Sequence, residues 1–470
     1  MPQPRRHLRG EGLLLREGFA AIRRELKVPT DFPEAALDEA SAVADSRTAG
    51  RADLTDLPFV TIDPPGSRDL DQAMHIERSG SGYRVRYAIV DVAAFVRPGG
   101  ALDRAVKERT LTVYCPDERV PLHPTVLSEG TASLLPGQDR PAIVWDLRLG
   151  ADGEVEEATV ARSVVRSREQ LDYPTEQARL DAGTAGEVLR LLVEVGTLRS
   201  RLERERGGVS LAKPEQEVVD AAGGGWDLEF RAPLPVENHN AQISLMTGMT
   251  AARMMLDAGV GILRTMPAAE PAQLERLQRR AVGLGVPWPH GTSYPAALAA
   301  LDPAAPATAA FLTAAVSLFR GAAWQPFRGT PPSPMVHGAV AAPYAHVTAP
   351  LRRLVDRYGL EICLAAQQSV DPPEWVLAEF SSLGELMATG ARRAAAVDHA
   401  CTDLVEAAVL APHVGEEFDG VALDPRTVQL RSSAVVAHTE DDDLPVGRRV
   451  RVRLLQADPA NRSVRLRRVR

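Results

Sequence analysis

The sequence contains few cysteines and has no long apolar run. Three cysteines in 470 residues, Cys115, Cys363 and Cys401, are odd in number and far apart, so they build neither a disulfide framework nor a C-x-x-C metal site. No segment approaches the roughly 18 uninterrupted apolar residues of a membrane-spanning helix, and the basic N-terminus is not followed by an apolar signal core. The sequence therefore predicts a cytoplasmic protein with reduced thiols and no membrane contact.

Lysine is also scarce, because only Lys27, Lys107 and Lys213 occur among the 54 basic residues. The other basic residues are arginines, a bias that fits a GC-rich genome as well as a preference for guanidinium groups that bind phosphate. The 62 acidic residues give a formal charge of −8. An evenly spread charge of this sign would argue against a nucleic-acid partner.

What is present is an ordinary globular composition, with 45% hydrophobic and 25% charged residues, 36 glycines and 36 prolines. These values exclude a fibrous or a largely disordered chain. At roughly 100 to 200 residues per domain, the length predicts two to four domains.

Three regions follow from the periodicity of the apolar residues. Residues 1–56 show short helical patterns in which basic residues outnumber acidic ones over the first 31 positions, which predicts a helical module, either helix-turn-helix-like and RNA-contacting or simply a packing unit. Residues 57–411 begin with strand patterns and continue with helical ones, which predicts a mixed α/β (α+β) domain. Residues 412–470 contain about five short strand patterns, the number expected for a small all-β OB barrel.

The densest chemistry lies where an apolar strand ends at Asp63, a Pro-Pro-Gly turn follows, and Asp69 and Asp71 arrive at alternate positions. If residues 69–71 are extended, the last two carboxylates point to one face about 6 to 7 Å apart, and the turn can bring Asp63 towards them. Such a cluster is costly without a cation, and Mg²⁺ prefers oxygen ligands. Taken alone, the same pattern also fits an acidic turn paired with Arg68.

This stretch resembles the ribonuclease II (RNB) family of exoribonucleases, whose motif places four aspartates after a strand. The resemblance continues at Thr112-Val-Tyr114-Cys-Pro-Asp, at Ser133-Leu-Leu-Pro-Gly-Gln-Asp-Arg140 and at Tyr344-Ala-His-Val-Thr348-Ala-Pro350-Leu-Arg352-Arg353. It implies a catalytic RNB domain over residues 57–411 and an OB-type RNA-binding domain over residues 412–470.

The sequence departs from the family at three places. Gln72 replaces the fourth aspartate; an amide oxygen can still ligate a metal, but it brings no charge. Met246 and Thr247 lie where the family commonly has an acidic pair. The 56 residues before the catalytic region are too few for the two cold-shock-type OB domains that many relatives carry there.

The resemblance implies a role for each matching residue. Asp63, Asp69, Asp71 and Gln72 would hold one or two Mg²⁺ ions, with Mn²⁺ as a substitute, and Asp71 would orient or deprotonate water. Arg352, expected at the start of a helix, would bind phosphate and stabilise charge in the transition state. The remaining expected RNA contacts are Tyr114, which would stack on the terminal base, Arg353, and Asp398, which would lie near the last ribose.

The C-terminal region is acidic in its first half and rich in arginine at its end. Arginines at alternate positions of a strand point to one side, so Arg449, Arg451, Arg465 and Arg467 predict a face that follows a phosphate backbone. A basic, merely solvated strand face is the alternative.

These features predict a monomeric, processive 3′→5′ exoribonuclease that hydrolyses single-stranded RNA to nucleoside 5′-monophosphates with metal-activated water. Processivity, direction and product come from the resemblance alone. Gln72 favours one rival, a catalytically weakened RNA-binding or regulatory relative. A metal-dependent nuclease acting on structured RNA or on DNA is another.

Overall fold

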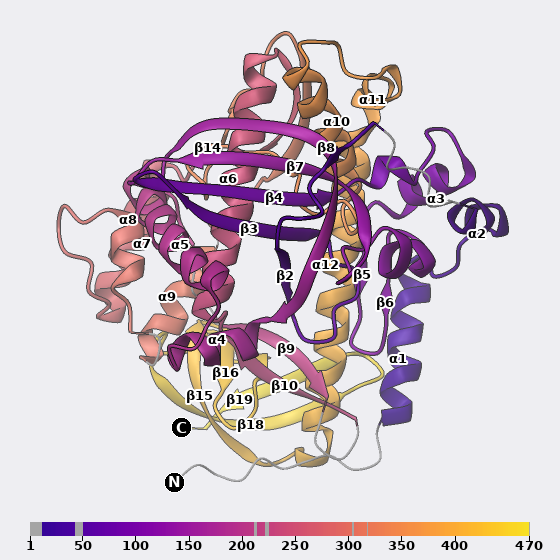
Figure 1. Ribbon diagram of the computed structural model, residues 1–470. Coiled ribbons are helices and arrows are strands. Elements are labelled where there is room, and N and C mark those ends of the chain that lie inside the picture. The colour runs from indigo at the N-terminus through magenta and orange to yellow at the C-terminus, as the bar shows by residue number, and fades with distance from the viewer. Residues whose placement is uncertain are drawn as a thin grey trace.

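The computed structural model describes residues 12–42, 50–210, 214–220, 225–302, 305–316 and 318–469. Figure 1 shows a curved sheet at one end of the molecule, a small barrel at the other, and the long helix α12 (Phe380–Leu410) running between them. The mixed α/β domain, the C-terminal barrel and the N-terminal helices all agree with the sequence prediction. None of the described helices is both long and apolar enough to cross a membrane.

The main sheet has six strands in the order β1-β8-β2-β3-β4-β7. Their bounds are Ala52–Asp53 for β1, Phe59–Asp63 for β2, Gln72–Ser79 for β3, Gly82–Val90 for β4, Asp139–Leu149 for β7 and Val155–Asp172 for β8. The first part of β8 pairs with β7 and its last part pairs with β2, so one strand closes the sheet on itself. Alternating apolar residues explain these strands, and their buried side chains include Tyr87 and Trp145, both 0% exposed.

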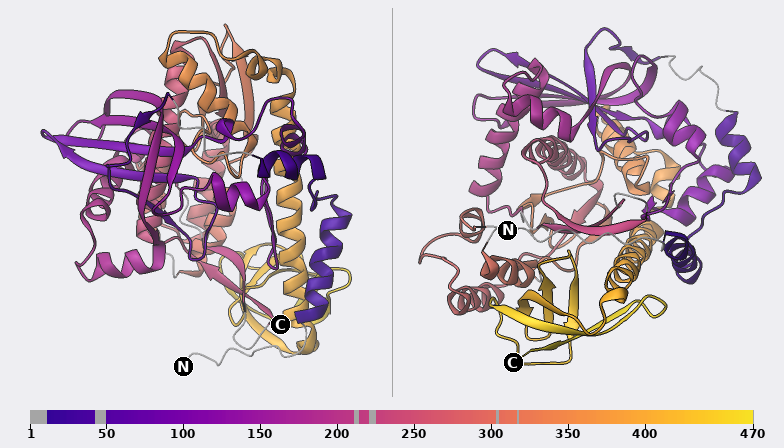
Figure 2. Two further views of the ribbon diagram at one scale, coloured as in Figure 1. Left: turned by 45° about the vertical axis from the view of Figure 1, so that its right-hand side comes forward. Right: turned by 90° about the horizontal axis from the view of Figure 1, so that it is seen from below.

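Helices pack against the sheet and connect it to the rest of the molecule (Figures 1 and 2). They are α3 (Ala101–Arg109), α4 (Tyr173–Asp181), α5 (Glu187–Glu205), α6 (Pro235–Asp257), α10 (Leu354–Gln367) and α11 (Glu374–Ala378), with single turns at Val92–Ala94, Leu127–Thr131 and Ala411–His413. Helix α6 begins earlier than its apolar pattern, because Pro235 occupies its first turn and Glu237 accepts a hydrogen bond from the Leu234 amide at 3.1 Å.

Several short strands pair outside the main sheet. They form the hairpins β5 (Val113–Tyr114) with β6 (Arg119–Val120) and β9 (Glu215–Asp220) with β10 (Trp226–Arg231), and the pairs β11 (Val260–Thr265) with β12 (Ala323–Arg328) and β13 (Val336–His337) with β14 (Ala342–Pro343). Helices α7 (Pro271–Leu284), α8 (Tyr294–Ala299) and α9 (Pro306–Val316) lie between β11 and β12 and enclose a small core of their own.

The C-terminal barrel is closed, with strand order β15-β16-β17-β19-β18. Its strands are β15 (Glu417–Asp424), β16 (Thr427–Leu430), β17 (Val436–Thr439), β18 (Arg449–Asp458) and β19 (Ser463–Arg468). Five strands closed in this way agree with the predicted OB barrel. Its core is continuous with that of its neighbours, because Val452 and Leu466 share one apolar cluster with Cys401 and Leu404 of α12.

The two N-terminal helices, α1 (Gly12–Glu25) and α2 (Glu34–Ser41), dock on different parts of the molecule. Helix α1 runs alongside α12 in both views of Figure 2 and buries Phe19 against the edge of Trp226, with ring centroids 5.2 Å apart. Helix α2 packs on α3, where Glu39 accepts hydrogen bonds from the Ala101 and Leu102 amides at 2.9 and 3.0 Å. Both helices therefore pack against residues 57–411. The predicted RNA contact of this module remains a prediction.

Helix α12 also approaches the chain next to the β5–β6 hairpin very closely. A Cβ added to Gly390 would lie 1.7 Å from the Thr110 hydroxyl, so only glycine fits at this crossing. The Thr110 side chain, which precedes the hairpin that carries Tyr114, thus packs directly against the backbone of α12.

Candidate active site

The three aspartates of the predicted cluster lie at the end of the sheet where strand β2 ends and strand β3 begins. Gly66 adopts a φ of +79°, which lets the Pro-Pro-Gly turn reverse the chain. Residues 69–71 belong to no regular strand, but Leu70 is fully buried. Its amide donates to the Ser133 hydroxyl at 3.0 Å and its carbonyl accepts from Leu134 at 3.1 Å. This pairing fixes Leu70 in the core and places Asp69 and Asp71 on either side of it.

Asp71 joins this turn to a segment 280 positions further along the chain. It is 3% exposed, and its Oδ1 accepts a hydrogen bond from the Leu351 amide at 2.7 Å. The Arg352 Nε lies 3.6 Å from its other oxygen. The neighbouring Gln72 donates its side-chain amide to the Thr348 carbonyl. The two halves of the family motif therefore meet at one place.

Burial opposes the negative charge of all three carboxylates. Desolvation raises the pKa of Asp71 well above its ordinary range, although Arg352 and the Leu351 amide partly offset it. Desolvation also raises the pKa of Asp63 to about 7, with Arg352 lowering it and Asp69 raising it further. The pKa of Asp69 is raised by burial, and Arg119 works against this rise. A cation at this site would lower the electrostatic cost of keeping the buried Asp71 and the half-buried Asp63 and Asp69 charged.

The donor set fits a hard divalent cation, because carboxylate oxygens and an amide oxygen are the ligands that Mg²⁺ prefers. Among the residues that the structure describes, no three His, Cys, Asp or Glu side chains lie close enough together to hold a metal ion. Asp69 is instead engaged by the guanidinium of Arg119, which also pairs with Glu129. An ion bound here would therefore complete its coordination with water or with a bound phosphate.

Arg119 is the site residue that sequence reasoning missed. It stands directly across the β5–β6 hairpin from Tyr114, as the register of the two strands shows. The only signal in the sequence is its position five residues after Tyr114. This spacing indicates that the two residues are neighbours only when the β5–β6 hairpin is known. Arg119 thus links the predicted base-stacking residue to the carboxylate cluster.

The prediction that Arg352 opens a helix is wrong. Helix α10 begins at Leu354, because Arg353 is extended (φ −135°, ψ 122°) and forms an isolated bridge with Leu111. Arg352 therefore lies in the turn before the helix, with its side chain 47% exposed and free to meet a ligand.

Arg353 is committed to an internal ion pair. Its Nε and Nη2 lie 2.9 and 2.8 Å from the two carboxylate oxygens of Asp356, and Asp356 in turn accepts the Ala349 amide at 2.7 Å. The pKa of Arg353 is raised, since the attraction of Asp356 outweighs the desolvation that alone would lower it. The guanidinium therefore braces the 349–353 turn from inside.

Tyr114 projects from the end of β5 with 55% of its surface exposed. Desolvation of its hydroxyl raises its pKa, and Asp69 and Asp71 add to this rise while Arg352 opposes it. The phenol therefore lies within electrostatic range of these carboxylates. Asp398 is exposed on α12, next to Val397, which shares an apolar cluster with Val113 of β5. Met246 and Thr247 are fully buried in α6, so they take no part in the site.

The barrel arginines alternate as predicted, with Arg449, Arg451 and Arg453 exposed and the intervening valines buried. Several of them are already paired. Arg451 and Arg453 both contact Glu417, at 3.2 and 2.8 Å, and Arg467 contacts Glu440. Among the residues described, Arg449 and Arg465 have no acidic partner within ion-pair distance. Of the four barrel arginines predicted to bind RNA, these two are therefore the ones available to an external phosphate.

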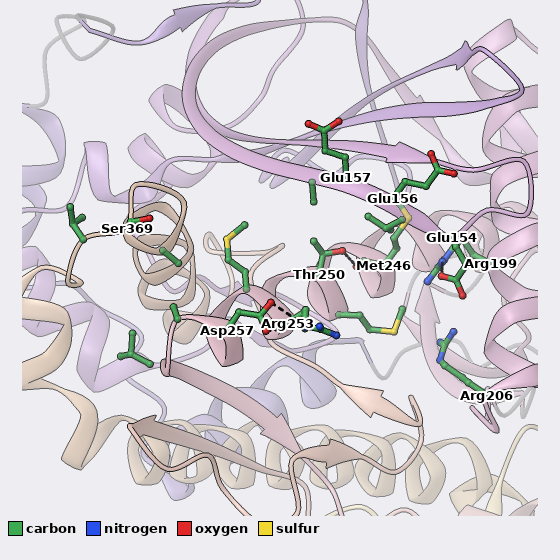
Figure 3. Close-up of a pocket in the computed structure, with 18 of the residues that line it drawn as sticks. Glu154, Glu156, Glu157, Arg199, Arg206, Met246, Thr250, Arg253, Asp257 and Ser369 are labelled. Atoms are coloured by element: carbon green, nitrogen blue, oxygen red, sulfur yellow. Dashed lines mark hydrogen bonds and ion pairs between the residues drawn. The ribbon is translucent and has the colours of Figure 1, made fainter.

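A groove of about 1140 Å³ lies elsewhere, between the start of β8, α5, α6 and the end of α10 (Figure 3). Its lining includes five carboxylates against three guanidinium groups, which are Glu154, Glu156, Glu157, Asp257 and Asp371 against Arg199, Arg206 and Arg253. The carboxylate cluster is at the opposite end of β8, where Asp63 pairs with Asp172. A groove with this excess of negative charge would repel a phosphate backbone, so it is not the candidate RNA site.

The raised pKa of Asp63 predicts how stability depends on pH in metal-free protein. Between the ordinary aspartate pKa of about 3.9 and about 7, the folded state keeps a proton that the unfolded state has lost. Stability should therefore fall as pH rises through this window. Thermal unfolding between pH 5 and 8 in EDTA should show the decline, and Asp63→Asn should flatten it. An equally steep decline in the variant would contradict the assignment.

The chain was compared with known proteins. The RNB domain matches residues 51–363, and the RNase II-type exonuclease C-terminal S1 domain matches residues 416–469. Ribonuclease R of Escherichia coli is 32% identical over 209 residues, which cover 42% of this chain and 26% of that protein. Ribonuclease R of Aquifex aeolicus is 27% identical over 443 residues, which cover 86% of this chain and 60% of the relative. The matches thus span between about a quarter and three fifths of these two relatives.

Two solved structures share the fold. Mycoplasma genitalium RNase R in complex with ribose-methylated single-stranded RNA superposes with a TM-score of 0.85 at 18% identity, covering 97% of this chain and 78% of that one. Yeast Ssd1, a pseudonuclease, superposes with a TM-score of 0.73 at 15% identity, covering 90% and 55%. Since the RNB domain match spans well over half of the residues and includes the carboxylate turn and the Arg352 turn, the chain belongs to the RNB family.

Proposed function

We propose that this protein is a cytoplasmic, monomeric exoribonuclease that hydrolyses single-stranded RNA processively from its 3′ end and releases nucleoside 5′-monophosphates. The observation that carries the proposal is the contact of Asp71 with the Leu351 amide and with Arg352. It places an acidic group suited to water and metal beside an exposed guanidinium suited to phosphate.

Each residue of the candidate site has its own proposed role. Asp63, Asp69 and Asp71, with the amide oxygen of Gln72, would hold one or two Mg²⁺ ions, or Mn²⁺ in their place. The bound metal would activate water and stabilise the charged oxygens of the reaction. Arg352 would bind the scissile phosphate, and the 349–353 turn, held by Arg353 and Asp356, would keep its guanidinium next to Asp71.

RNA would be held on either side of this centre. The exposed ring of Tyr114 can stack on the terminal base, a contact worth about 1 to 3 kcal/mol and independent of base identity. Such indifference suits an enzyme that degrades any sequence. Asp398 would contact the last ribose, and the barrel would follow the backbone further from the end through Arg449 and Arg465. The RNA complex of the Mycoplasma genitalium relative supports RNA as the ligand.

One observation favours a second candidate, a weakened RNA-binding relative. Gln72 brings no negative charge where the family has an aspartate, and its amide nitrogen is already used by the Thr348 carbonyl. Ssd1, which shares the fold, is described as a pseudonuclease.

A single assay separates the candidates: end-labelled single-stranded RNA, duplex RNA and single-stranded DNA are incubated with Mg²⁺ or with EDTA. Mononucleotide release from single-stranded RNA with Mg²⁺ alone supports the exoribonuclease, and binding without cleavage supports the relative.

Asp71→Asn should abolish cleavage and leave RNA affinity within a few fold. The amide oxygen can still accept the Leu351 N–H, so the fold survives while the charge that serves metal and water is lost. Asp371→Asn is the matched control, because Asp371 is exposed in the acidic groove. Product release and fluorescence anisotropy measure the two properties. Near wild-type mononucleotide release by Asp71→Asn would contradict the site.

Gln72→Asp tests whether the amide is needed. A carboxylate cannot donate to the Thr348 carbonyl, and losing a buried hydrogen bond costs about 1 to 3 kcal/mol. We therefore expect cleavage roughly tenfold slower at every Mg²⁺ concentration. The measurement is a Mg²⁺ titration of both proteins on one single-stranded RNA. An unchanged maximal rate reached at lower Mg²⁺ would show that the natural glutamine weakens the metal site.

Arg449→Ala combined with Arg465→Ala should reduce the salt dependence of RNA binding. Each phosphate contact contributes about 0.7 to the slope of log K against log salt for single strands, so losing both should flatten it by about 1.4. Arg453→Ala is the control on the same strand, and it should change the slope less because Glu417 already pairs with Arg453. The slope is measured by anisotropy in EDTA. Equal slopes in all three proteins would exclude the barrel as an RNA anchor.

A further inference from the structure

Two of the three cysteines in the chain meet beside the predicted base-stacking residue. Cys115 follows Tyr114 directly in the β5–β6 hairpin, and its amide donates to the Glu118 carbonyl at 3.0 Å. Cys401 lies in α12 and is 2% exposed. The side chains of both residues pack in one apolar cluster with Val113 and Val397, and each thiol shifts the pKa of the other. Cysteines 286 positions apart in the sequence are thus neighbours.

A cation completes this arrangement. The guanidinium of Arg23, from α1, reaches the hairpin that carries Cys115 and lowers the pKa of its thiol. The same group contacts Asp117 at 2.6 Å and Glu118 at 2.9 Å, so both acids of the hairpin fix its position. Arg23 is 7% exposed. A buried guanidinium beside a thiol favours the thiolate, the reactive form of cysteine.

The two thiols are unequal. The hydrogen bond from Cys401 and the charge of Arg23 lower the pKa of Cys115 to about 7, although burial acts against them. The pKa of Cys401 is raised by the same hydrogen bond and by burial. Cys115 is half-buried and reachable by a small oxidant, whereas Cys401 is closed off behind it. This is the arrangement of a nucleophilic and a resolving thiol.

We propose that peroxide oxidises Cys115 and Cys401 to a reversible disulfide that ties the Tyr114 hairpin to α12. The Cys115 thiolate attacks one peroxide oxygen, the O–O bond breaks, and Cys115 becomes a sulfenic acid as hydroxide leaves. The Cys401 sulfur then attacks the Cys115 sulfur, the S–O bond breaks, and hydroxide leaves with the thiol proton as water. Two thiols and one H₂O₂ thus give one disulfide and two waters.

The disulfide would change the surroundings of the proposed substrate. A covalent S–S bond of about 2.05 Å would tie the hairpin to α12 and fix the positions of both sulfur atoms. Arg23 would lose the thiolate as a partner. The hairpin carries Tyr114 and also Arg119, which holds Asp69. Oxidation would therefore reach the base-stacking residue and the carboxylate cluster together, and we expect slower cleavage.

Cys363 supplies the internal control. It is fully buried in α10, burial raises its thiol pKa, and its sulfur is hydrogen-bonded to the Ala251 carbonyl. It lies in a different apolar cluster from the other two cysteines. A selective reaction at Cys115 and Cys401 should leave it reduced.

The test uses the full chain, reduced and then treated with H₂O₂. Free thiols counted after denaturation should fall from three to one per chain, and peptide mapping should find the tryptic peptide 110–119 linked to 394–426. Cys363→Ser should form the same link, whereas Cys115→Ser and Cys401→Ser should form no intramolecular disulfide. Three remaining thiols, a bond involving Cys363, or linkage between chains would overturn the proposal.

The effect of oxidation on RNA cleavage rests on the proposed function, so it is measured in an assay separate from the peptide mapping. Oxidised wild type should degrade single-stranded RNA at least about threefold more slowly and recover with dithiothreitol, while Cys401→Ser should not respond to peroxide. A mapped disulfide with unchanged cleavage would overturn the regulatory half of the proposal. A reduced protein that cleaves no RNA would refute the proposed function, and peptide mapping would still decide whether the disulfide forms.

Discussion

The hydrogen bond from the Leu351 amide to the Asp71 carboxylate is the contact on which the candidate active site depends. It is buried, and it joins the turn between β2 and β3 to the turn before α10. A buried carboxylate without such a partner would be strongly destabilising. Arg352 and the neighbouring bond from Gln72 to Thr348 strengthen the same junction. The contacts that position the candidate site residues therefore also stabilise the domain, so a change that disrupts them would destabilise the fold as well.

Strands β2, β4, β7, the first part of β8 and the OB barrel could be predicted because their apolar residues alternate and their turns are rich in glycine and proline. Strands β1 and β3 were not predicted. Hairpin β9–β10 could not be predicted, since Glu215–Asp220 is mostly polar and at most half-buried. Strands β11 and β12 could not be predicted from the sequence for another reason. They pair with each other across the three helices of the 271–316 region, and periodicity carries no information about such distant pairing.

The candidate site shows the same division. Asp63, Asp69 and Asp71 could be identified from residue type and spacing, and Arg352 from the resemblance to the RNB family. The engagement of Arg353 by Asp356 and of Asp69 by Arg119 could not, because each depends on side-chain directions that only the folded chain defines. Motif reasoning finds the residues that handle a ligand more readily than those that hold them in position. In the barrel, for example, Glu417 occupies two arginines that resemble equally good phosphate ligands in the sequence.

Strand β8 has a consequence for how such a chain can change in evolution. Its 18 residues pair with β7 on one side and with β2 on the other, and its last residue lies opposite Asp63. Inserting or deleting one residue in β8 would shift its register against a neighbour and turn inward-facing side chains outward. The helices between β11 and β12 have a separate small core and no such constraint. Length variation among homologues should therefore accumulate in that helical region, while the length of β8 stays fixed.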